Sequence, residues 1–142
     1  MAEVQTRPVR AVVIDDSHFQ CTVLRRMLES RYGEKVQVET YVDPVEAVEC
    51  LGPGIGLLLL DWEMPALDGA AMLEEARRRG VDLKRVIIRS ARHADELHRQ
   101  FDGRGCLCVI EKGEQEQQTA FLMILDSIVK RSSQAAASQS TT

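Results

Sequence analysis

Long hydrophobic runs are absent from the 142-residue sequence, and none approaches the roughly 20 apolar residues that a membrane-spanning helix needs. The first ten residues, MAEVQTRPVR, also lack the apolar core of a secretory signal. Positive charge is not in excess, because 18 Lys and Arg residues stand against 22 Asp and Glu residues, for a net charge of −4. That balance argues against binding to nucleic acid or to anionic lipid through bulk charge. We therefore expect no membrane association and no direct nucleic-acid binding.

Cysteine occurs four times but never in a CxxC pair, and no histidine stands at zinc-ligand spacing from any of the four. All four lie in apolar, periodic stretches rather than in loops: Cys21, Cys50, Cys106 and Cys108. Cys106 and Cys108 are too close along an expected strand to form a disulfide easily. We interpret the cysteines as reduced, mostly buried thiols in a cytoplasmic protein.

Apolar residues make up 44% of the chain, and their spacing follows two alternating periods. Short β-branched or wholly apolar runs predict five strands, at residues 10–14, 36–42, 57–60, 85–88 and 106–110. Helical spacing predicts five helices, at residues 17–31, 43–50, 70–79, 91–101 and 115–131. Strands that alternate with helices predict right-handed crossovers and a parallel sheet covered on both faces. The expected fold class is α/β, doubly wound around a five-stranded parallel sheet.

One domain of ordinary size accounts for this length. Residues 9–131 hold all the expected elements, and residues 1–8 form an N-terminal extension. Residues 132–142, SSQAAASQSTT, contain no large apolar side chain that could offset the entropy of ordering them. We therefore expect them to be a disordered tail or the start of a linker.

Polar and charged residues follow four of the expected strands. Asp15 and Asp16 follow the first, Asp61 the third, Ser90 the fourth and Lys112 the fifth. Because functional sites of doubly wound sheets lie at the carboxyl ends of the strands, we expect these side chains to converge. Carboxylates about 5 Å apart repel by roughly 3 kcal/mol per pair at an effective dielectric constant near 20.

A divalent cation would relieve this repulsion, because three carboxylates and one ammonium group leave a local charge of −2. Only oxygen ligands are offered, so the expected ion is Mg²⁺, or Mn²⁺ in its place. Mg²⁺ keeps several water positions that phosphoryl oxygens can take.

The run Asp61–Gly69, DWEMPALDG, is of the form DxxMPxxDG. Together with the acidic pair, Ser90 and Lys112, it resembles the receiver domain of two-component response regulators, over roughly residues 9–131. The resemblance implies a flavodoxin-like (βα)5 fold. It also implies that the protein is a signalling phosphoacceptor and not an enzyme. Such a phosphoacceptor takes its phosphoryl group from a histidine kinase or phosphotransfer protein, and it promotes its own phosphorylation and dephosphorylation.

Carried over by position, the resemblance makes Asp61 the phosphoacceptor and a metal ligand. Asp16 would bind Mg²⁺ directly, Asp15 mostly through water, and Glu63 through its backbone carbonyl.

The resemblance also implies contacts to the phosphoryl group: Ser90 would donate a hydrogen bond to it, and Lys112 would form an ion pair with it. Three positions depart from the usual receiver pattern, and two more flank the expected phosphoryl group. Ser90 replaces the commoner threonine, Val109 stands where an aromatic residue is usual, and Gly113 replaces a proline. Glu63 and Arg92 flank the expected phosphoryl position, where they either tune dephosphorylation or form a surface ion pair.

Two readings of the whole protein stay open, a stand-alone regulator and the N-terminal receiver of a longer one. The partners would then be a downstream protein target or a fused output domain. A homodimer would use the face made by the fourth helix, the fifth strand and the last helix. The alternative function is a Mg²⁺-dependent phosphohydrolase-like enzyme, although Glu63 stands where such enzymes need a second Asp.

Overall fold

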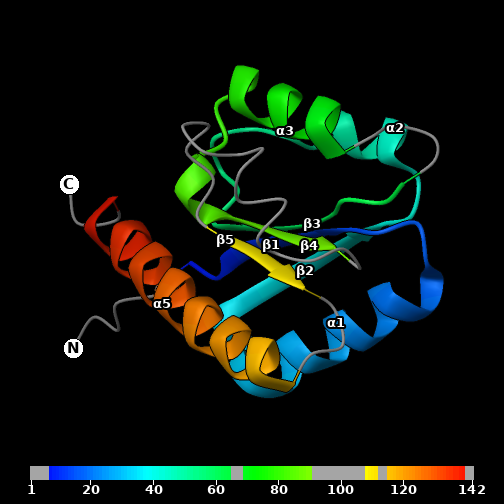
Figure 1. The fold of residues 1–142 in the computed structure, drawn as a ribbon. Helices are drawn as coiled ribbons and strands as arrows, with labels where there is room; N and C mark the ends of the chain where they lie inside the picture. Colours follow the sequence, from blue (N-terminus) through cyan, green and yellow to red (C-terminus); the bar gives the residue numbers. More distant parts are fainter. Residues whose placement is uncertain (1–6, 65–68, 91–107, 112–114, 140–142) are drawn as a thin grey trace, which may run out of the picture.

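The computed structural model describes residues 7–64, 69–90, 108–111 and 115–139 (Figure 1). These residues form a five-stranded parallel sheet in the order β2-β1-β3-β4-β5. The strands are β1 (Val9–Ile14), β2 (Val36–Tyr41), β3 (Leu57–Asp61), β4 (Val86–Ser90) and β5 (Cys108–Glu111). After β2 the chain crosses to the other side of β1, so the order of the strands switches between β1 and β3. This arrangement confirms the expected doubly wound α/β fold.

Helices cover both faces of the sheet, with α1 and α5 on one side and α2 and α3 on the other (Figure 1). They are α1 (His18–Tyr32), α2 (Pro44–Val48), α3 (Gly69–Arg78) and α5 (Gln115–Gln139), with short 3₁₀ turns at Gly33–Lys35 and Leu83–Arg85. The expected helix at 91–101, Arg92, Lys112 and Gly113 lie outside the described residues. No helix of the described ranges is both long and apolar enough to cross a bilayer.

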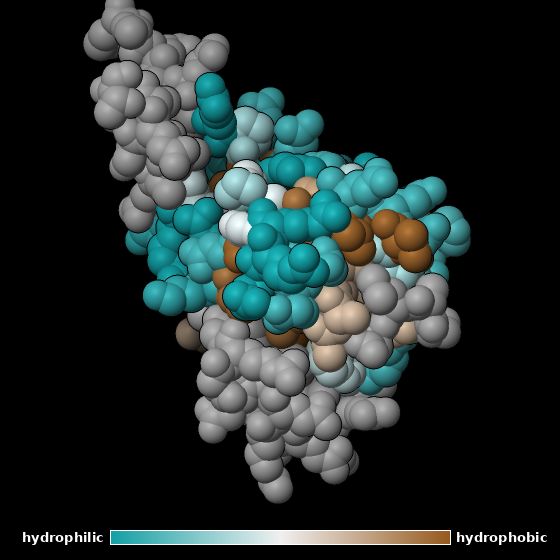
Figure 2. Space-filling model, turned by 90° about the horizontal axis from the view of Figure 1, so that it is seen from above, coloured by the Kyte–Doolittle hydropathy of each residue, from teal (hydrophilic) through white to brown (hydrophobic). Residues whose placement is uncertain are grey.

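The apolar run of β3 is explained by its place in the middle of the sheet, where all five of its residues are buried. Leu58 and Leu60 pack with the core that faces α2 and α3. Leu57 and Leu59 pack with the opposite core, which includes Phe121 and other residues of α5. A strand buried on both faces shows no polar alternation, as the sequence pattern predicted. The solvent side of α2 and α3 is mainly hydrophilic (Figure 2).

Local signals fix the ends of the helices. The Ser17 hydroxyl accepts a hydrogen bond from the Gln20 amide at 3.2 Å and caps the start of α1. Asp43 caps α2 in the same way and is followed by Pro44 at the first helical position. Gly33 ends α1 with a φ of +56°, a conformation that favours glycine.

The last helix differs from the expectation. α5 continues to Gln139 instead of ending at Arg131. Ser132 is buried, and its hydroxyl donates a hydrogen bond of 2.8 Å to the carbonyl oxygen of Gly56, just before β3. A search for large apolar side chains missed this contact because a small polar residue makes it.

Candidate functional site

Three carboxylates converge at the carboxyl ends of β1 and β3, beside the switch in strand order. Asp15 and Asp16 directly follow β1, and Asp61 is the last residue of β3. Each of them offers a carboxylate oxygen, and these oxygens lie within 4.8 Å of one another. Asp15 and Asp61 are buried, whereas Asp16 is exposed to solvent. At this separation each pair of charges repels by about 3 kcal/mol at an effective dielectric constant near 20. The predicted convergence of the three carboxylates is therefore confirmed.

Backbone amides hold the two buried carboxylates in place. Oδ1 of Asp15 accepts a hydrogen bond of 2.9 Å from the Ser17 amide, and the Asp15 amide donates to the carbonyl oxygen of Tyr41 on β2. Oδ1 of Asp61 accepts a hydrogen bond of 3.2 Å from the amide of Glu63. These hydrogen bonds fix the orientation of both carboxylates.

The segment after β3 is fixed by packing. The Trp62 amide donates to the carbonyl oxygen of Arg89 at 2.9 Å, which ties this residue to β4. The Trp62 ring is half-buried and lies against Gly69, where a Cβ atom would overlap the ring. The glycine that closes the DxxMPxxDG run is therefore required by a close approach. This packing anchors both ends of the segment that carries Glu63.

Ser90 lies at the end of β4, fully buried, and its hydroxyl donates a hydrogen bond of 2.5 Å to Oε1 of Glu63. Two residues that the sequence placed around the phosphoryl position are thus in direct contact. The sequence pattern gave no indication of this pairing. The direct metal ligation expected of the Glu63 carbonyl, and the roles expected of Lys112 and Arg92, stay predictions.

Sequence reasoning missed Arg89, the residue before Ser90 on β4, which lies beside Asp15 of the cluster. Its guanidinium NH1 is 3.8 Å from Oδ2 of Asp15, and the guanidinium carbon is 5.8 Å from the centre of the Phe121 ring on α5. Burial lowers the pKa of Arg89, while Asp15 and then Asp61 act in the opposite direction. One signal was available in the sequence, namely an arginine directly after the apolar residues of β4.

The donor set fits a hard divalent cation. Three carboxylates meet, with two of them buried and one open to water, and they belong to the oxygen ligands that Mg²⁺ and Mn²⁺ take. Because Asp16 is exposed, a cation held by this cluster would be reachable from solvent. It would then supply charge neutralisation to a phosphoryl group that arrives from outside.

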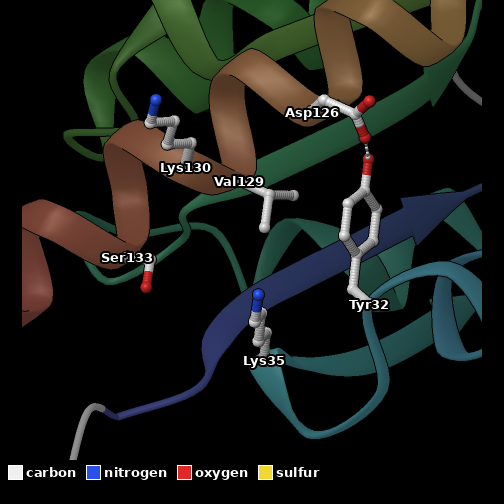
Figure 3. A pocket seen from close by; sticks show the side chains of 6 residues that line it. All are labelled: Tyr32, Lys35, Asp126, Val129, Lys130 and Ser133. Carbon is white, nitrogen blue, oxygen red and sulfur yellow. Dashed lines mark hydrogen bonds between the residues drawn. The ribbon is translucent and has the colours of Figure 1, made fainter.

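A second polar region lies at the C-terminal end of α1. There a hollow of about 380 Å³ is lined by Tyr32, Lys35 and residues of α5 (Figure 3). Asp126 of α5 accepts hydrogen bonds from Arg31 Nε at 2.8 Å, from Arg31 NH2 at 2.7 Å and from the Tyr32 hydroxyl at 2.7 Å. These bonds tie α5 to the end of α1. The side chains of Arg31 and Asp126 are 38% and 48% exposed.

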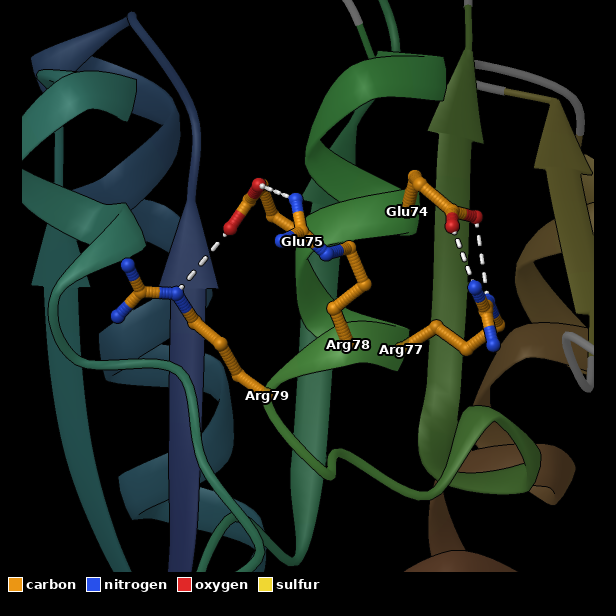
Figure 4. A network of polar contacts seen from close by, with 5 residues as sticks. All are labelled: Glu74, Glu75, Arg77, Arg78 and Arg79. Carbon is orange, nitrogen blue, oxygen red and sulfur yellow. Dashed lines mark hydrogen bonds and ion pairs between the residues drawn. The ribbon is translucent and has the colours of Figure 1, made fainter.

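The arginine run at the end of α3 forms a surface network (Figure 4). Arg77 pairs with Glu74, and Glu75 pairs with both Arg78 and Arg79 at 3.1 and 3.2 Å. These pairs join residues three or four apart on an exposed helix surface, where solvent screens them and each contributes little to stability. The network supports a structural role for the run.

Comparison with known proteins identifies the class. The family model described as "Response regulator receiver domain" matches residues 11–122. The chain therefore belongs to the response regulator receiver domain family and is a signalling module of two-component systems. Its fold and the carboxylate cluster are those expected from the resemblance found in the sequence.

Two curated relatives and one solved structure illustrate the range of the family. The chain is 38% identical over 93 residues to the chemotaxis protein CheY of Treponema pallidum, across 63% of this chain and 62% of that protein. It is 36% identical over 92 residues to protein-glutamate methylesterase/protein-glutamine glutaminase 5 of Myxococcus xanthus, across 63% of this chain and 26% of that protein. The matched part thus spans less than two thirds of either relative.

The fold is also that of the response regulator domain of Thermotoga maritima CheB. That structure has a TM-score of 0.68 at 24% identity and is matched over 98% of its length and 90% of this chain. At this level of identity the similarity bears on the fold alone.

Proposed function

We propose that Asp61 accepts a phosphoryl group from a histidine kinase or a phosphotransfer protein, and that the modified chain then signals through protein contacts. The observation that carries the proposal is the meeting of three carboxylates within 4.8 Å at the switch in strand order, in a chain of the receiver family. Asp61 is buried at the end of β3, and the Glu63 amide fixes one of its oxygens. A carboxylate fixed in this way would be oriented for attack on phosphorus.

Mg²⁺, or Mn²⁺ in its place, would be held by Asp15, Asp16, Asp61 and the Glu63 carbonyl. When bound, it neutralises charge on the phosphoryl oxygens. In the transfer, a bond forms between an Asp61 oxygen and phosphorus while the bond from phosphorus to the donor nitrogen breaks. Lys112 would pair with the transferred group.

Ser90 would change its partner in this reaction. Its hydroxyl donates to Glu63 in the structure, and a phosphoryl group on Asp61 would offer it a stronger, more highly charged acceptor. Exchange of Glu63 for the phosphoryl group would pull Ser90, and with it the end of β4, toward Asp61. The same exchange would release the Glu63 carboxylate to act on the lifetime of the phosphorylated state.

The decisive experiment incubates the protein with acetyl phosphate and Mg²⁺ and measures its intact mass. We expect one added phosphoryl group on the wild type and none on Asp61→Asn. Asp126→Asn is the matched control, since it removes another aspartate that lies outside the cluster, and it should be modified like the wild type. No added mass on the wild type, or equal addition to Asp61→Asn, would contradict the proposal.

The remaining expectations concern the setting of the domain. We propose a cytoplasmic location for the protein. Its partners would be a histidine kinase or phosphotransfer protein on the input side and a separate target or fused output domain on the output side. A homodimer through the face of the fourth helix, β5 and α5 belongs to the same proposal. Nothing among the described residues favours the phosphohydrolase alternative, because Glu63, at the position of the required acid, is engaged with Ser90.

A further inference from the structure

Arg89 is the charged residue of β4, where it follows three apolar residues. The three preceding residues of β4 are each fully buried, and the Arg89 side chain is only 14% exposed. Because side chains alternate along a strand, Arg89 points to the same face as Ile87, which packs with Phe121 in the core under α1 and α5. Burying a guanidinium there is costly unless an opposite charge compensates it.

The compensating charge is Asp15 of the acidic cluster. NH1 of Arg89 lies 3.8 Å from Oδ2 of Asp15, whereas Oδ1 of Asp15 is taken by the Ser17 amide. A separation of 3.8 Å is too long for a hydrogen bond, so the two groups interact as charges. Phe121 supplies a second favourable contact on the aromatic face, with the guanidinium carbon 5.8 Å from the ring centre.

We propose that Arg89 is an internal counter-charge of the acidic cluster, which holds Asp15 in place without a cation and weakens the binding of a divalent cation beside it. The inference deepens the proposed function and depends on its metal site. Arg89 touches neither substrate nor reacting atoms, so it is a positioning residue. With Arg89 included, the charge of the three carboxylates falls from −3 to −2, and a cation must be bound in the presence of a fixed positive charge.

The test is a calorimetric titration of metal-free protein with Mg²⁺ alone, which measures affinity without phosphorylation. Arg89→Gln removes the charge, and Arg89→Lys keeps it. Arg10→Gln is the matched control, because Arg10 forms an ion pair with Glu39 on the same sheet but lies five residues before Asp15 along β1. All three variants are compared with the wild type at one fixed ionic strength.

We expect Arg89→Gln to bind Mg²⁺ at least about tenfold more tightly than the wild type, since a unit charge a few ångströms from a divalent ion is worth that much even at high effective dielectric. Arg89→Lys and Arg10→Gln should stay within about twofold of the wild type, because both keep the charge beside Asp15. An unchanged or weaker affinity of Arg89→Gln overturns the inference. An equal tightening in Arg89→Lys also overturns it, because charge would then not be the cause.

Two further outcomes separate this inference from the function on which it depends. Equal Mg²⁺ affinity in all chains refutes the role of Arg89 alone, and absence of Mg²⁺ binding in every chain refutes the metal site itself. If Arg89→Gln does not fold without the cation, the double variant Asp15→Asn/Arg89→Gln is compared with Asp15→Asn. The double variant should again bind Mg²⁺ at least about tenfold more tightly, and equal affinity of the two overturns the inference.

Discussion

Two arginine–aspartate pairs lie in different parts of this molecule, and they differ in burial and in hydrogen-bond geometry. Arg89 and Asp15 lie at the carboxyl edge of the sheet with side chains 14% and 2% exposed, and their closest atoms are 3.8 Å apart. Arg31 and Asp126 join α1 to α5 near the surface through two parallel hydrogen bonds of 2.8 and 2.7 Å. The better geometry belongs to the more exposed pair.

This difference shows what each pair does. In the exposed pair, both carboxylate oxygens of Asp126 accept hydrogen bonds from Arg31, and the Tyr32 hydroxyl donates a third. The pair therefore joins α1 to α5 through direct hydrogen bonds. The buried pair interacts by charge at a distance, beside two further carboxylates of the cluster. Buried charges are expensive to keep, and this pair lies at the edge of the sheet where we propose that a cation and a phosphoryl group bind.

The largest effect expected from this contrast is on stability without metal. Arg89→Gln removes the positive charge that lies 3.8 Å from the buried Asp15 carboxylate, so in the presence of a chelator it should lower the free energy of unfolding by about 3 kcal/mol. Asp126→Asn breaks the exposed pair and should cost under about 1 kcal/mol, because solvent screens it. Urea denaturation of the two variants measures both losses. Equal losses would erase the distinction between the pairs.

A second effect concerns Mg²⁺ itself. At a Mg²⁺ concentration ten times its Kd, binding to the folded state should raise the free energy of unfolding by about 1.4 kcal/mol. Asp126→Asn should keep the full gain, since its change lies outside the cluster. Asp61→Asn should lose most of it. Melting curves with and without Mg²⁺ provide the measurement, and a gain that survives in Asp61→Asn would place the cation elsewhere.

A third effect tests the end of α5. Ser132→Ala removes the buried hydrogen bond to the Gly56 carbonyl and should cost about 1 kcal/mol, because a buried acceptor loses its donor. Ser133→Ala is the matched control, since Ser133 is only half-buried at the rim of the hollow shown in Figure 3. Chemical denaturation of the two variants should separate them. Equal, small losses would mean that residues beyond Arg131 add nothing to the domain.

Ser132 also marks how far the sequence could predict the fold. Strand and helix positions followed from periodicity, because large apolar residues such as Leu58 and Leu60 must be buried and their spacing shows how. Contacts made by small polar side chains leave no such signal. The order of α5 beyond Arg131 was missed for that reason.

The site divides in the same way. The convergence of Asp15, Asp16 and Asp61 was predictable, because parallel strands end at one edge and the residues at their ends are read directly from the chain. The bond between Ser90 and Glu63 and the placing of Arg89 beside Asp15 were not. Both depend on side-chain directions between residues at the ends of different strands, which a single sequence does not encode in any local pattern.

The smallest effect expected is the pH dependence of the exposed pair. Arg31, and after it the Tyr32 hydroxyl, lower the pKa of Asp126 to about 2. A carboxylate whose pKa is lower in the folded than in the unfolded state stabilises the fold above its unfolded pKa of about 4, and this contribution disappears as the pH falls through the folded value. Because the pair is close to half exposed, the contribution stays under about 1 kcal/mol.

The difference in unfolding free energy between the wild type and Asp126→Asn should therefore be constant from pH 7 to about pH 5 and shrink toward zero between pH 4 and pH 2. Urea denaturation at a series of pH values measures it, and Tyr32→Phe, which keeps the two bonds from Arg31, should retain most of the pH dependence. A difference that grows toward low pH would have the wrong sign for a carboxylate with a lowered pKa. The ionised form of Asp126 would then not stabilise the contact between α1 and α5, and the contrast with Arg89 and Asp15 would not hold.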